Sequence, residues 1–400
     1  MGASDPGADG PRAFRPACRP VIAGLGLTPV GKVYGRTAAQ FAADAVRLAV
    51  QDAGLRLSDV DGLLTSGGVT DGVRLGLHRD LGLRDLRLLA EMHCFGATAG
   101  QMVQYAALAV ASGLAEVVAC VFADDPLQPD RSTGAAYHRS AGLTGWDGLM
   151  GVNLMHGTNP LYAMAARRHM ETYGTTSEQL AHVAVAQRAW AGLNPLAQLR
   201  TPITVADHQD SRMIAEPFHL FDCCLVSNGG AAVLVTTAER AAELARPPVH
   251  VLGWGQGHPG HFGRRNDDFG LVTGAVQSGR QAFGMAGLTV EDVDVAEIYD
   301  CYTYTALVSL EDYGFCAKGE GGPFVASGVL GPRGTLAMNT GGGQLSSYYL
   351  WGMTPLTEAI MQARGEAGER QVADHDVVLV SGNGGILDHH TTLLLGPEPV

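Results

Sequence analysis

Short apolar runs alternate with helical patterns along most of the chain, and their order repeats in its two halves. The first half has strand-like runs and helical patterns at 62–64, 88–92 and 117–122 and at 40–51 and 101–112. The second half has the same set, at 295–298, 335–338 and 377–380 and at 279–285 and 354–363. Continuous apolar runs of this length are typical of strands that are buried on both faces of a sheet. The order of strand, turn, helix and strand therefore predicts two similar α/β domains, each with a mixed sheet.

A short motif marks the same point in both halves. Ala53-Gly54-Leu55, followed by Asp59-Val60-Asp61, recurs with the same spacing as Ala286-Gly287-Leu288, followed by Asp292-Val293-Asp294. Each copy follows a helical pattern and precedes an apolar run, so each predicts a helix, a glycine stop, an acidic turn and a strand. The shared context indicates that one supersecondary unit occurs twice.

We expect residues 1–19 to form a disordered tail, because this stretch is rich in Gly, Pro, Asp and Arg and lacks the apolar segment of a signal peptide. The N-terminal domain is predicted over 20–247 and the C-terminal domain over 248–400. An insertion at about 124–220 interrupts the N-terminal domain, and we interpret it as a lid over a site between the halves. It carries two helical patterns, at 161–173 and 177–191.

Composition narrows the class of protein. The chain is 46% hydrophobic and 17% charged and contains 54 glycines, which is typical of a compact α/β protein. Its formal net charge of −13 argues against a nucleic-acid partner, because phosphate recognition needs a basic surface. The sequence has no apolar run of about 18 residues, so we expect no membrane span and a cytoplasmic location.

The seven cysteines indicate neither a disulfide framework nor a metal site. Their spacing is irregular, and Cys223 and Cys224 are adjacent rather than separated as in a zinc-binding pair. Reduced, buried thiols of a cytosolic protein are the simplest interpretation. We therefore expect no metal and no bound cofactor.

Five motifs, in this order, connect the chain to a known family. They are His169-Met170-Glu171-x-Tyr173-Gly174-Thr175, Asn194-Pro195, Val226-Ser227-Asn228-Gly229-Gly230-Ala231-Ala232, Glu297-Ile298-Tyr299-Asp300-Cys301-Tyr302 and Asn339-Thr340-Gly341-Gly342-Gly343. Together they resemble the thiolase superfamily, and within it the sterol-carrier-type thiolases and their thiolase-like relatives. The resemblance covers almost the whole chain after about Arg19, and it implies a thiolase fold with a homodimeric core.

The same resemblance implies that the thiolase nucleophile is missing. Active thiolases need a cysteine at the start of an N-domain helix, where the helix dipole lowers the pKa of the thiol. That position falls on Gly96, which has no side chain to acylate. Cys94 lies two residues earlier, on the strand side of the turn, and we expect it to pack rather than to react.

Two tyrosines take the places of other thiolase residues. Tyr349 aligns with the histidine of the Gly-His-Pro motif, and Tyr299 aligns with the Asn or His that helps to hold the thioester oxygen. Only Ser381 or Gly382 stands where a thiolase has its second cysteine. This pattern is similar to the thiolase-like aldolases of steroid side-chain breakdown, which lack the cysteine and use a pair of tyrosines. The alternative is that both tyrosines are core aromatics, as buried tyrosines often are.

The resemblance suggests supporting residues as well. Tyr348, His169, Asp300 and Cys94 are possible supporting residues, and His169 matches a family histidine on the insertion. Reserve bases are found at His93, His156, His169, His389 and His390, of which the last two are expected to be structural. Five glycines are expected to form the acyl-binding or oxyanion region: Gly96, Gly342, Gly343, Gly384 and Gly385.

From these residues we predict carbon–carbon lyase chemistry on a β-hydroxyacyl thioester. A retro-aldol cleavage needs the enolate stabilisation of a thiolase pocket but no acyl-enzyme. Tyr299 is assigned to the β-hydroxyl and Tyr349 to the enolate, and the two roles can be exchanged. Two alternatives remain: an acyltransferase or Claisen-type condensing enzyme that uses Cys94, and an inert scaffold or lipid-binding partner.

The resemblance also implies what the protein binds. We expect an acyl-CoA or acyl-carrier substrate, with coenzyme A as part of the substrate rather than as a cofactor. A homodimer and a small partner with a zinc ribbon and an OB-fold are expected on the same ground. The residues themselves choose neither the acyl group nor the direction of the reaction.

Overall fold

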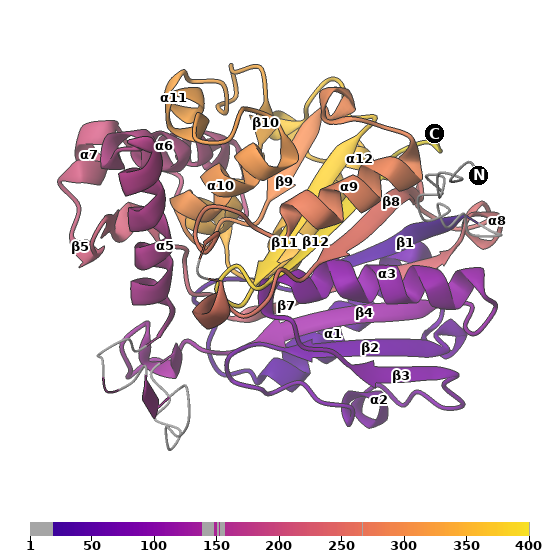
Figure 1. Ribbon diagram of the computed structural model, residues 1–400. Helices are drawn as coiled ribbons and strands as arrows, with labels where there is room; N and C mark the ends of the chain where they lie inside the picture. The colour runs from indigo at the N-terminus through magenta and orange to yellow at the C-terminus, as the bar shows by residue number, and fades with distance from the viewer. Residues whose placement is uncertain (1–18, 138–147, 150–151, 153–156, 266, 400) are drawn as a thin grey trace, which may run out of the picture.

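The computed structural model describes residues 19–137, 148–149, 152, 157–265 and 267–399 (Figure 1). Within these residues, ten strands form one sheet in the order β10-β9-β11-β12-β8-β1-β7-β4-β2-β3. A separate two-stranded sheet pairs β5 (Met213–Ala215) with β6 (Phe218–His219). The predicted tail lies outside the described residues except for Arg19.

The large sheet consists of two halves with the same topology. The N-terminal half contains β1 (Pro20–Leu27), β2 (Gly62–Gly67), β3 (Leu88–Glu91), β4 (Val118–Asp124) and β7 (Gly229–Thr237). The C-terminal half contains β8 (Val249–Gly257), β9 (Val295–Ile298), β10 (Ala337–Met338), β11 (Val378–Gly384) and β12 (His389–Gly396).

In each half the second strand pairs in parallel with the third and the fourth, and the fourth, fifth and first strands pair antiparallel in that order. The halves join where β1 pairs with β8, through Val21 with His250 and Ile22 with Val249. The predicted pair of similar mixed-sheet α/β units is confirmed. The chain passes from one half to the other between β7 and β8.

Helices cover the outer faces of the two halves and fill the space between them (Figure 1). The N-terminal half and the insertion contain α1 (Ala38–Ala53), α2 (Leu77–Asp80), α3 (Thr98–Ala111), α5 (Thr158–Tyr173), α6 (Ser177–Leu193), α7 (Val205–Gln209) and α8 (Ala238–Ala241). The C-terminal half contains α9 (Ala275–Ala286), α10 (Thr303–Tyr313), α11 (Gly321–Ala326) and α12 (Met353–Ala363). Helix α1 packs on β1, β7 and β4, and α9 packs on β8 and β12, whereas α3 and α12 each contact strands of both halves.

The repeated motif has the same structure in both halves. Gly54 ends α1 and Gly287 ends α9, each in the left-handed conformation, with φ of 72° and 74°. A residue without a Cβ adopts this conformation at little cost, which explains glycine at both helix ends. The last aspartate of each copy then accepts backbone N–H groups that precede the fourth strand: Asp61 from Glu116 and Val117, and Asp294 from Val377.

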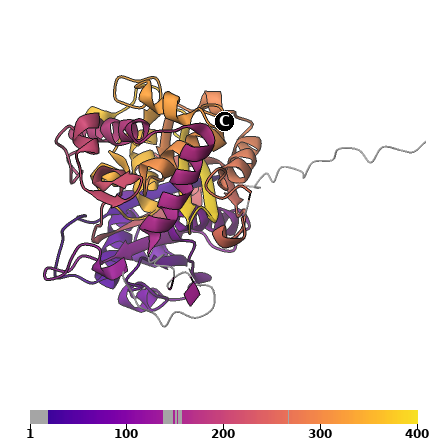
Figure 2. The same ribbon diagram turned by 60° about the vertical axis from the view of Figure 1, so that its left-hand side comes forward.

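The insertion distinguishes the halves. The chain between β4 and β7 spans residues 125–228, whereas the corresponding connection between β11 and β12 spans only 385–388. Helix α6 packs on α10 and α11 of the C-terminal half. Figure 2 brings the magenta helices of the insertion to the front, where they lie against the orange C-terminal half. The insertion therefore belongs to the N-terminal half by sequence but is supported by the other half.

Several predicted strand boundaries differ from the structure, most of all those of β11 and β10. β11 continues to Gly384, although the stretch after Val380 reads as a glycine-rich loop. Its glycines are needed for close packing, because a Cβ on Gly382 would lie 2.8 Å from the carbonyl oxygen of Gly96. β10 is shorter than predicted and contains only Ala337 and Met338.

Candidate active site

A cavity of about 710 Å³ lies where the halves and the insertion meet. Phe95 reaches it from the N-terminal half, Tyr162 from α5 of the insertion, and Tyr299 and Tyr349 from the C-terminal half. Most of its wall is aromatic or aliphatic, with few charged groups. Such a wall suits a large apolar acyl group whose orientation is fixed by a small number of polar contacts.

The two candidate tyrosines meet in this cavity. Tyr299 directly follows β9 and is buried, and Tyr349 follows the π-helical turn at Gly343–Ser347 and is half-buried. Their hydroxyl oxygens lie 2.9 Å apart, at hydrogen-bonding distance, with the rings inclined at 61°. Burial raises the pKa of both phenols well above 10, and at Tyr299 a neighbouring thiol, Cys301, adds to this effect. Both therefore stay protonated at neutral pH.

Gly96 leaves the space that the Tyr299 ring occupies. A Cβ on Gly96 would lie 2.2 Å from Cε2 and 2.3 Å from Cζ of Tyr299, and 2.2 Å from the carbonyl oxygen of Asn383. These distances are far below a normal van der Waals contact, so no side chain fits at position 96 while the ring is in place. The glycine at the thiolase nucleophile position and the tyrosine at the thioester-oxygen position are thus sterically linked.

Asp300 holds together the two segments that carry the tyrosines. Its carboxylate accepts the backbone N–H of Gln344, at 2.9 and 3.0 Å, and that of Leu345, at 3.2 Å. Gly343 has no Cβ here, because one would lie 2.3 Å from a carboxylate oxygen of Asp300. Burial raises the pKa of Asp300 to about 7, and the backbone N–H groups oppose this rise. Asp300 does not line the main cavity. Its contacts instead position the segment that leads to Tyr349.

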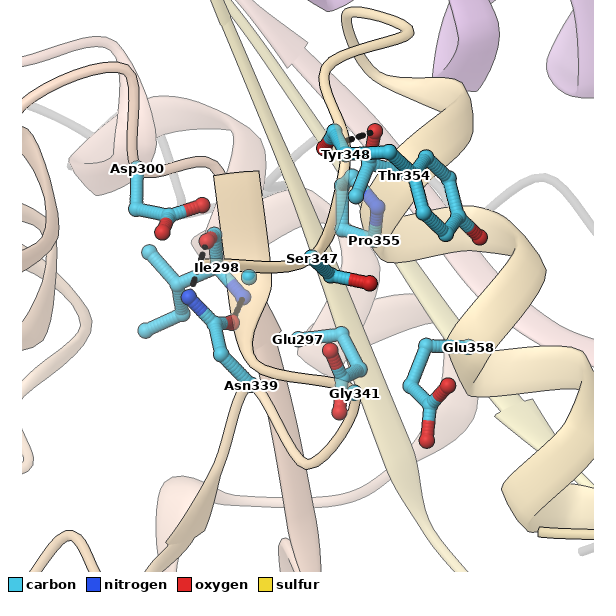
Figure 3. Close-up of a pocket in the computed structure, with 11 residues that line it drawn as sticks. Glu297, Ile298, Asp300, Asn339, Gly341, Ser347, Tyr348, Thr354, Pro355 and Glu358 are labelled. Carbon is cyan, nitrogen blue, oxygen red and sulfur yellow. Dashed lines mark hydrogen bonds between the residues drawn. The ribbon is translucent and has the colours of Figure 1, made fainter. Parts of the chain in front are cut away.

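A second, much smaller cavity of about 10 Å³, roughly the space of one water, lies between the end of β9, the segment 339–348 and the start of α12 (Figure 3). Asp300, Glu297 and Glu358 border it. Glu358 forms a two-point ion pair with Arg370, at 2.7 and 3.0 Å, and burial together with the charge of Glu358 raises the pKa of Glu297 well above its usual range. Asn339 bonds both backbone groups of Ile298, as Figure 3 shows. These contacts support the end of β9, from which Tyr299 follows.

The other supporting candidates have partners of their own. His169 is fully buried, its Nε2 lies 3.0 Å from Glu311 and its Nδ1 lies 3.0 Å from Thr175, so it ties α5 to α10 and does not line the cavity. The Tyr348 hydroxyl bonds Thr357 at 2.8 Å and faces the small cavity.

Cys94 is half-buried before the helical turn that leads into α3, and it does not line the main cavity. Its backbone N–H donates to the Thr98 hydroxyl at 2.7 Å. This placement agrees with packing rather than nucleophilic attack.

The reserve histidines divide into three kinds. His389 lines the cavity, and its Nδ1 lies 3.0 Å from Nδ1 of His258. His390 points the other way, bonded to Ser381 and Tyr313, and burial lowers its pKa to about 3. His93 packs on Phe95 without lining the cavity, and His156 lies outside the described residues.

The five glycines also separate. Gly384 and Gly385 line the main cavity. Gly343 borders the small cavity, and neither Gly342 nor Gly96 lines the main one. Gly96 is nevertheless next to one of the two candidate tyrosines, since it contacts the Tyr299 ring.

Sequence reasoning missed several residues of the wall. Three thiols, Cys223, Cys224 and Cys301, line the cavity, and burial raises the pKa of each, to about 12 for Cys301. Tyr302 stacks on Phe218 and bonds Asn159 of the insertion. No sequence signal singles out these thiols, but the aromatic cluster at 299–304 is visible as a run of tyrosines after a buried strand.

Among the described residues, no group of three or more His, Cys, Asp or Glu side chains is arranged to hold a metal ion. In the same part of the chain, every helix is too short or too polar to cross a membrane.

Comparison with known proteins identifies the class. Residues 255–397 match the family described as thiolase C-terminal domain-like. The chain is 38% identical to a steroid side-chain-cleaving aldolase of Thermomonospora curvata, over 91% of this chain and 95% of the relative. With the repeated mixed-sheet halves and the site between them, this similarity shows that the chain belongs to the thiolase superfamily.

Within that superfamily, two further similarities point to the same branch. The chain is 37% identical to the 17-hydroxy-3-oxo-4-pregnene-20-carboxyl-CoA lyase of Mycobacterium tuberculosis, over 91% of this chain and 96% of the relative. The solved structure of an Ltp2-ChsH2(DUF35) aldolase superposes with a TM-score of 0.84 at 36% identity, covering 94% of this chain and 97% of that one.

Proposed function

We propose that this protein is a thiolase-like aldolase that cleaves, or in reverse forms, the Cα–Cβ bond of a β-hydroxyacyl-CoA. The observation that carries the proposal is the pair of hydroxyls of Tyr299 and Tyr349, 2.9 Å apart, with the Tyr299 ring packed on Gly96, the glycine that the resemblance aligns with the thiolase nucleophile. The aldolase and lyase relatives support it.

The cleavage requires one proton to move and no covalent intermediate. The β-hydroxyl loses its proton, its O–H electrons form the carbonyl, and the Cα–Cβ bond breaks. The electron pair of that bond passes to the thioester as an enolate, and Cα then takes up a proton. The products are a ketone or aldehyde and a shortened acyl-CoA, with no net gain or loss of protons.

Two hydrogen-bonded phenols suit this balance. Tyr299 can accept the β-hydroxyl proton while it donates its own to Tyr349, which gives its proton to Cα. Neither ring has to exist as a free phenolate, which is consistent with pKa values raised well above 10 by burial. We assign Tyr299 to the β-hydroxyl and Tyr349 to the enolate, with the reverse assignment as the alternative.

The acyl group is proposed to be a steroid side chain. Two relatives act on steroid side chains by name, and the cavity of about 710 Å³ has a largely apolar wall. In 17-hydroxy-3-oxo-4-pregnene-20-carboxyl-CoA the β-carbon is C17, so retro-aldol cleavage would give a 17-ketosteroid and propionyl-CoA.

The test is product analysis by mass spectrometry after incubation with this thioester. We expect both products and no adduct on the protein. Tyr349→Phe and Tyr299→Phe should each lower kcat about 100- to 10,000-fold. Tyr348→Phe is the matched control, since its hydroxyl bonds Thr357 instead, and it should stay within about threefold of the wild type.

Two other outcomes would replace the proposal. An acyl adduct on Cys94 or a cavity thiol would make the protein an acyltransferase or a Claisen-type condensing enzyme. Tight binding of the thioester, with no turnover and no effect of the tyrosine variants, would make it an inert scaffold or a lipid-binding partner.

We further propose that the protein acts in the cytoplasm as a homodimer with a small DUF35-type partner, because a structure similar to it is an aldolase that contains such a subunit. In the described residues β3 is an edge strand of the sheet, and Leu89 on β3 and Tyr105 and Leu108 on α3 are large apolar side chains that are exposed. Sedimentation of the purified protein should give the mass of two chains. A monomer at micromolar concentration would contradict the dimer.

A further inference from the structure

We infer that the side-chain amide of Asn383 is a third polar group of the reacting centre, and that it donates a hydrogen bond to the thioester carbonyl oxygen of the bound acyl group. The inference deepens the proposed function and rests on it for the identity of the ligand.

Asn383 has an amide that the protein leaves unpartnered. The residue lies at the end of β11, is 1% exposed and lines the main cavity. Neither Oδ1 nor Nδ2 has a hydrogen-bond partner among the described residues. Buried amides are almost always bonded, because an unmade bond forfeits the hydration that was lost on burial. An unpartnered amide on the wall of a cavity is therefore expected to bond with whatever fills that cavity.

Asn383 is also an immediate neighbour of Tyr299. A Cβ on Gly96 would lie within 2.3 Å of both the carbonyl oxygen of Asn383 and Cζ of Tyr299, the carbon that carries the hydroxyl. These two atoms are therefore close together. The two residues leave adjacent parallel strands at the same end, since Ile298 on β9 is in register with Ser381 on β11. Carboxyl ends of neighbouring parallel strands converge on one site. The backbone of Asn383 is thus beside the Tyr299 ring, and Asn383 lines the same cavity as both tyrosines.

His390 is the competing partner for this amide. It faces Asn383 across the β11–β12 pair, and its Nδ1 also has no partner among the described residues. Its Nε2 is already bonded to Ser381, at 2.8 Å, and to Tyr313, at 3.1 Å, which fixes the ring. No bond joins Asn383 and His390 in the structure, and a small rearrangement that joined them would still leave Oδ1 of the amide without a partner.

The chemistry requires a donor that the tyrosines do not supply. Each phenol has one O–H, and in the proposed cleavage both O–H groups carry protons between the β-hydroxyl and Cα. The negative charge that develops on the thioester oxygen then needs a fixed donor that does not transfer its proton. A neutral amide held by a buried strand meets this need without adding charge to an apolar cavity.

Infrared spectroscopy tests the hydrogen bond without requiring cleavage. The ligand is a saturated acyl-CoA without the β-hydroxyl, labelled with 13C at the thioester carbonyl. In the wild-type protein the bound carbonyl stretch should lie at lower frequency than in water-free solvent. Asn383→Ala and Asn383→Leu, which keeps much of the side-chain volume but has no donor, should each abolish that shift. An unchanged shift in both variants would overturn the inference.

Kinetics supply the second measurement. Asn383→Ala should lower kcat about 100-fold, the usual loss for one oxyanion donor, while the Kd of the saturated acyl-CoA changes little. Asn383→Ser, which retains a hydroxyl donor, should recover part of kcat. An alanine variant whose kcat stays within about threefold of the wild type would contradict the assignment.

A matched control separates this role from simple burial. Thr65 on β2 also has a buried side-chain oxygen without a partner in the described residues, but it does not line the cavity. Thr65→Val should leave both the carbonyl shift and kcat unchanged. If the wild type shows the shift but cleaves no β-hydroxyacyl-CoA, the proposed function fails and the assignment of Asn383 stands.

Discussion

The two halves of the molecule share a strand order and a repeated acidic turn, yet they differ at the connection between their fourth and fifth strands. In the N-terminal half that connection spans residues 125–228, and in the C-terminal half it spans 385–388. Both connections line the same cavity, the long one with Tyr162 and the short one with Gly385, and the Tyr162 hydroxyl bonds the Gly385 carbonyl at 2.5 Å. The two halves share a frame, and their different connections at this point both contribute to one site.

The segments that lead into the central helices show how the chemistry is divided. Phe95-Gly96 precedes α3 and Trp351-Gly352 precedes α12, and both aromatic residues have positive φ, 52° and 49°. A Cβ on Gly352 would lie 2.2 Å from the carbonyl oxygen of Gly96, so these segments pack against one another. In the segment before α3, Gly96 has no side chain and so leaves room for the Tyr299 ring. The C-terminal half supplies both candidate hydroxyls. The site is therefore defined by the different residues that the two halves supply, rather than by the fold that they share.

The largest expected effect comes from filling the N-terminal space. Gly96→Cys should displace the Tyr299 ring, lower aldol cleavage at least about 1,000-fold and reduce the free energy of unfolding by about 1–3 kcal/mol. Urea unfolding and steady-state kinetics measure the two losses.

A double variant tests whether the loss arises from that contact. Gly96→Cys should cost less stability when Tyr299→Ala is also present, because the clash with the ring is removed and only the contact with the Asn383 carbonyl oxygen remains. Gly284→Ala is the control, since no atom lies within 4 Å of a Cβ there. Equal losses in both backgrounds would refute the steric link.

An intermediate effect is expected from removing a contact that holds the insertion, residues 125–228, against the C-terminal half. His169→Ala removes the buried contact of α5 with Glu311 and should lower the free energy of unfolding by about 3 kcal/mol. KM should rise more than kcat falls, because α5 carries part of the cavity wall. Arg167→Ala, which removes only exposed ion pairs of the same helix, should cost less than about 1 kcal/mol. A His169 variant with unchanged stability would show that the insertion is held by other contacts.

The smallest effect concerns the repeated turn. Asp61 accepts two backbone N–H groups and Asp294 accepts one, so Asp61→Ala should cost about 2 kcal/mol and Asp294→Ala about 1 kcal/mol. Urea unfolding of the two variants measures the difference. The reverse order would mean that the two copies of the turn do not contribute in proportion to their hydrogen bonds.

The sequence predicts the features that have local signals, namely the two similar halves and the order of their strands and helices. The paired halves follow from apolar runs and from the Ala-Gly-Leu and Asp-Val-Asp motif, because a glycine stop and an acceptor for strand N–H groups have local sequence signals. The meeting of Tyr299 and Tyr349 follows from the alignment of their motifs to one family, and the 2.9 Å contact agrees with that expectation while leaving the roles to experiment.

What the sequence misses depends on packing between distant segments. The strand character of Ser381–Gly384 is hidden, because its glycines are explained only by the approach of the turn before α3. His169 reads as a site histidine, but its partner Glu311 is remote in sequence. Asn383 gives no sequence signal at all, since the feature that distinguishes it is the lack of a partner in three dimensions among the described residues.

The contact between Gly96 and the Tyr299 ring has an evolutionary consequence. A substitution that restores cysteine at position 96 meets the Tyr299 ring, and one that shortens Tyr299 removes a hydroxyl from the proposed pair. On the proposed mechanism, each of these single substitutions lowers cleavage before the other can compensate for it. A cysteine nucleophile at position 96 therefore requires both substitutions.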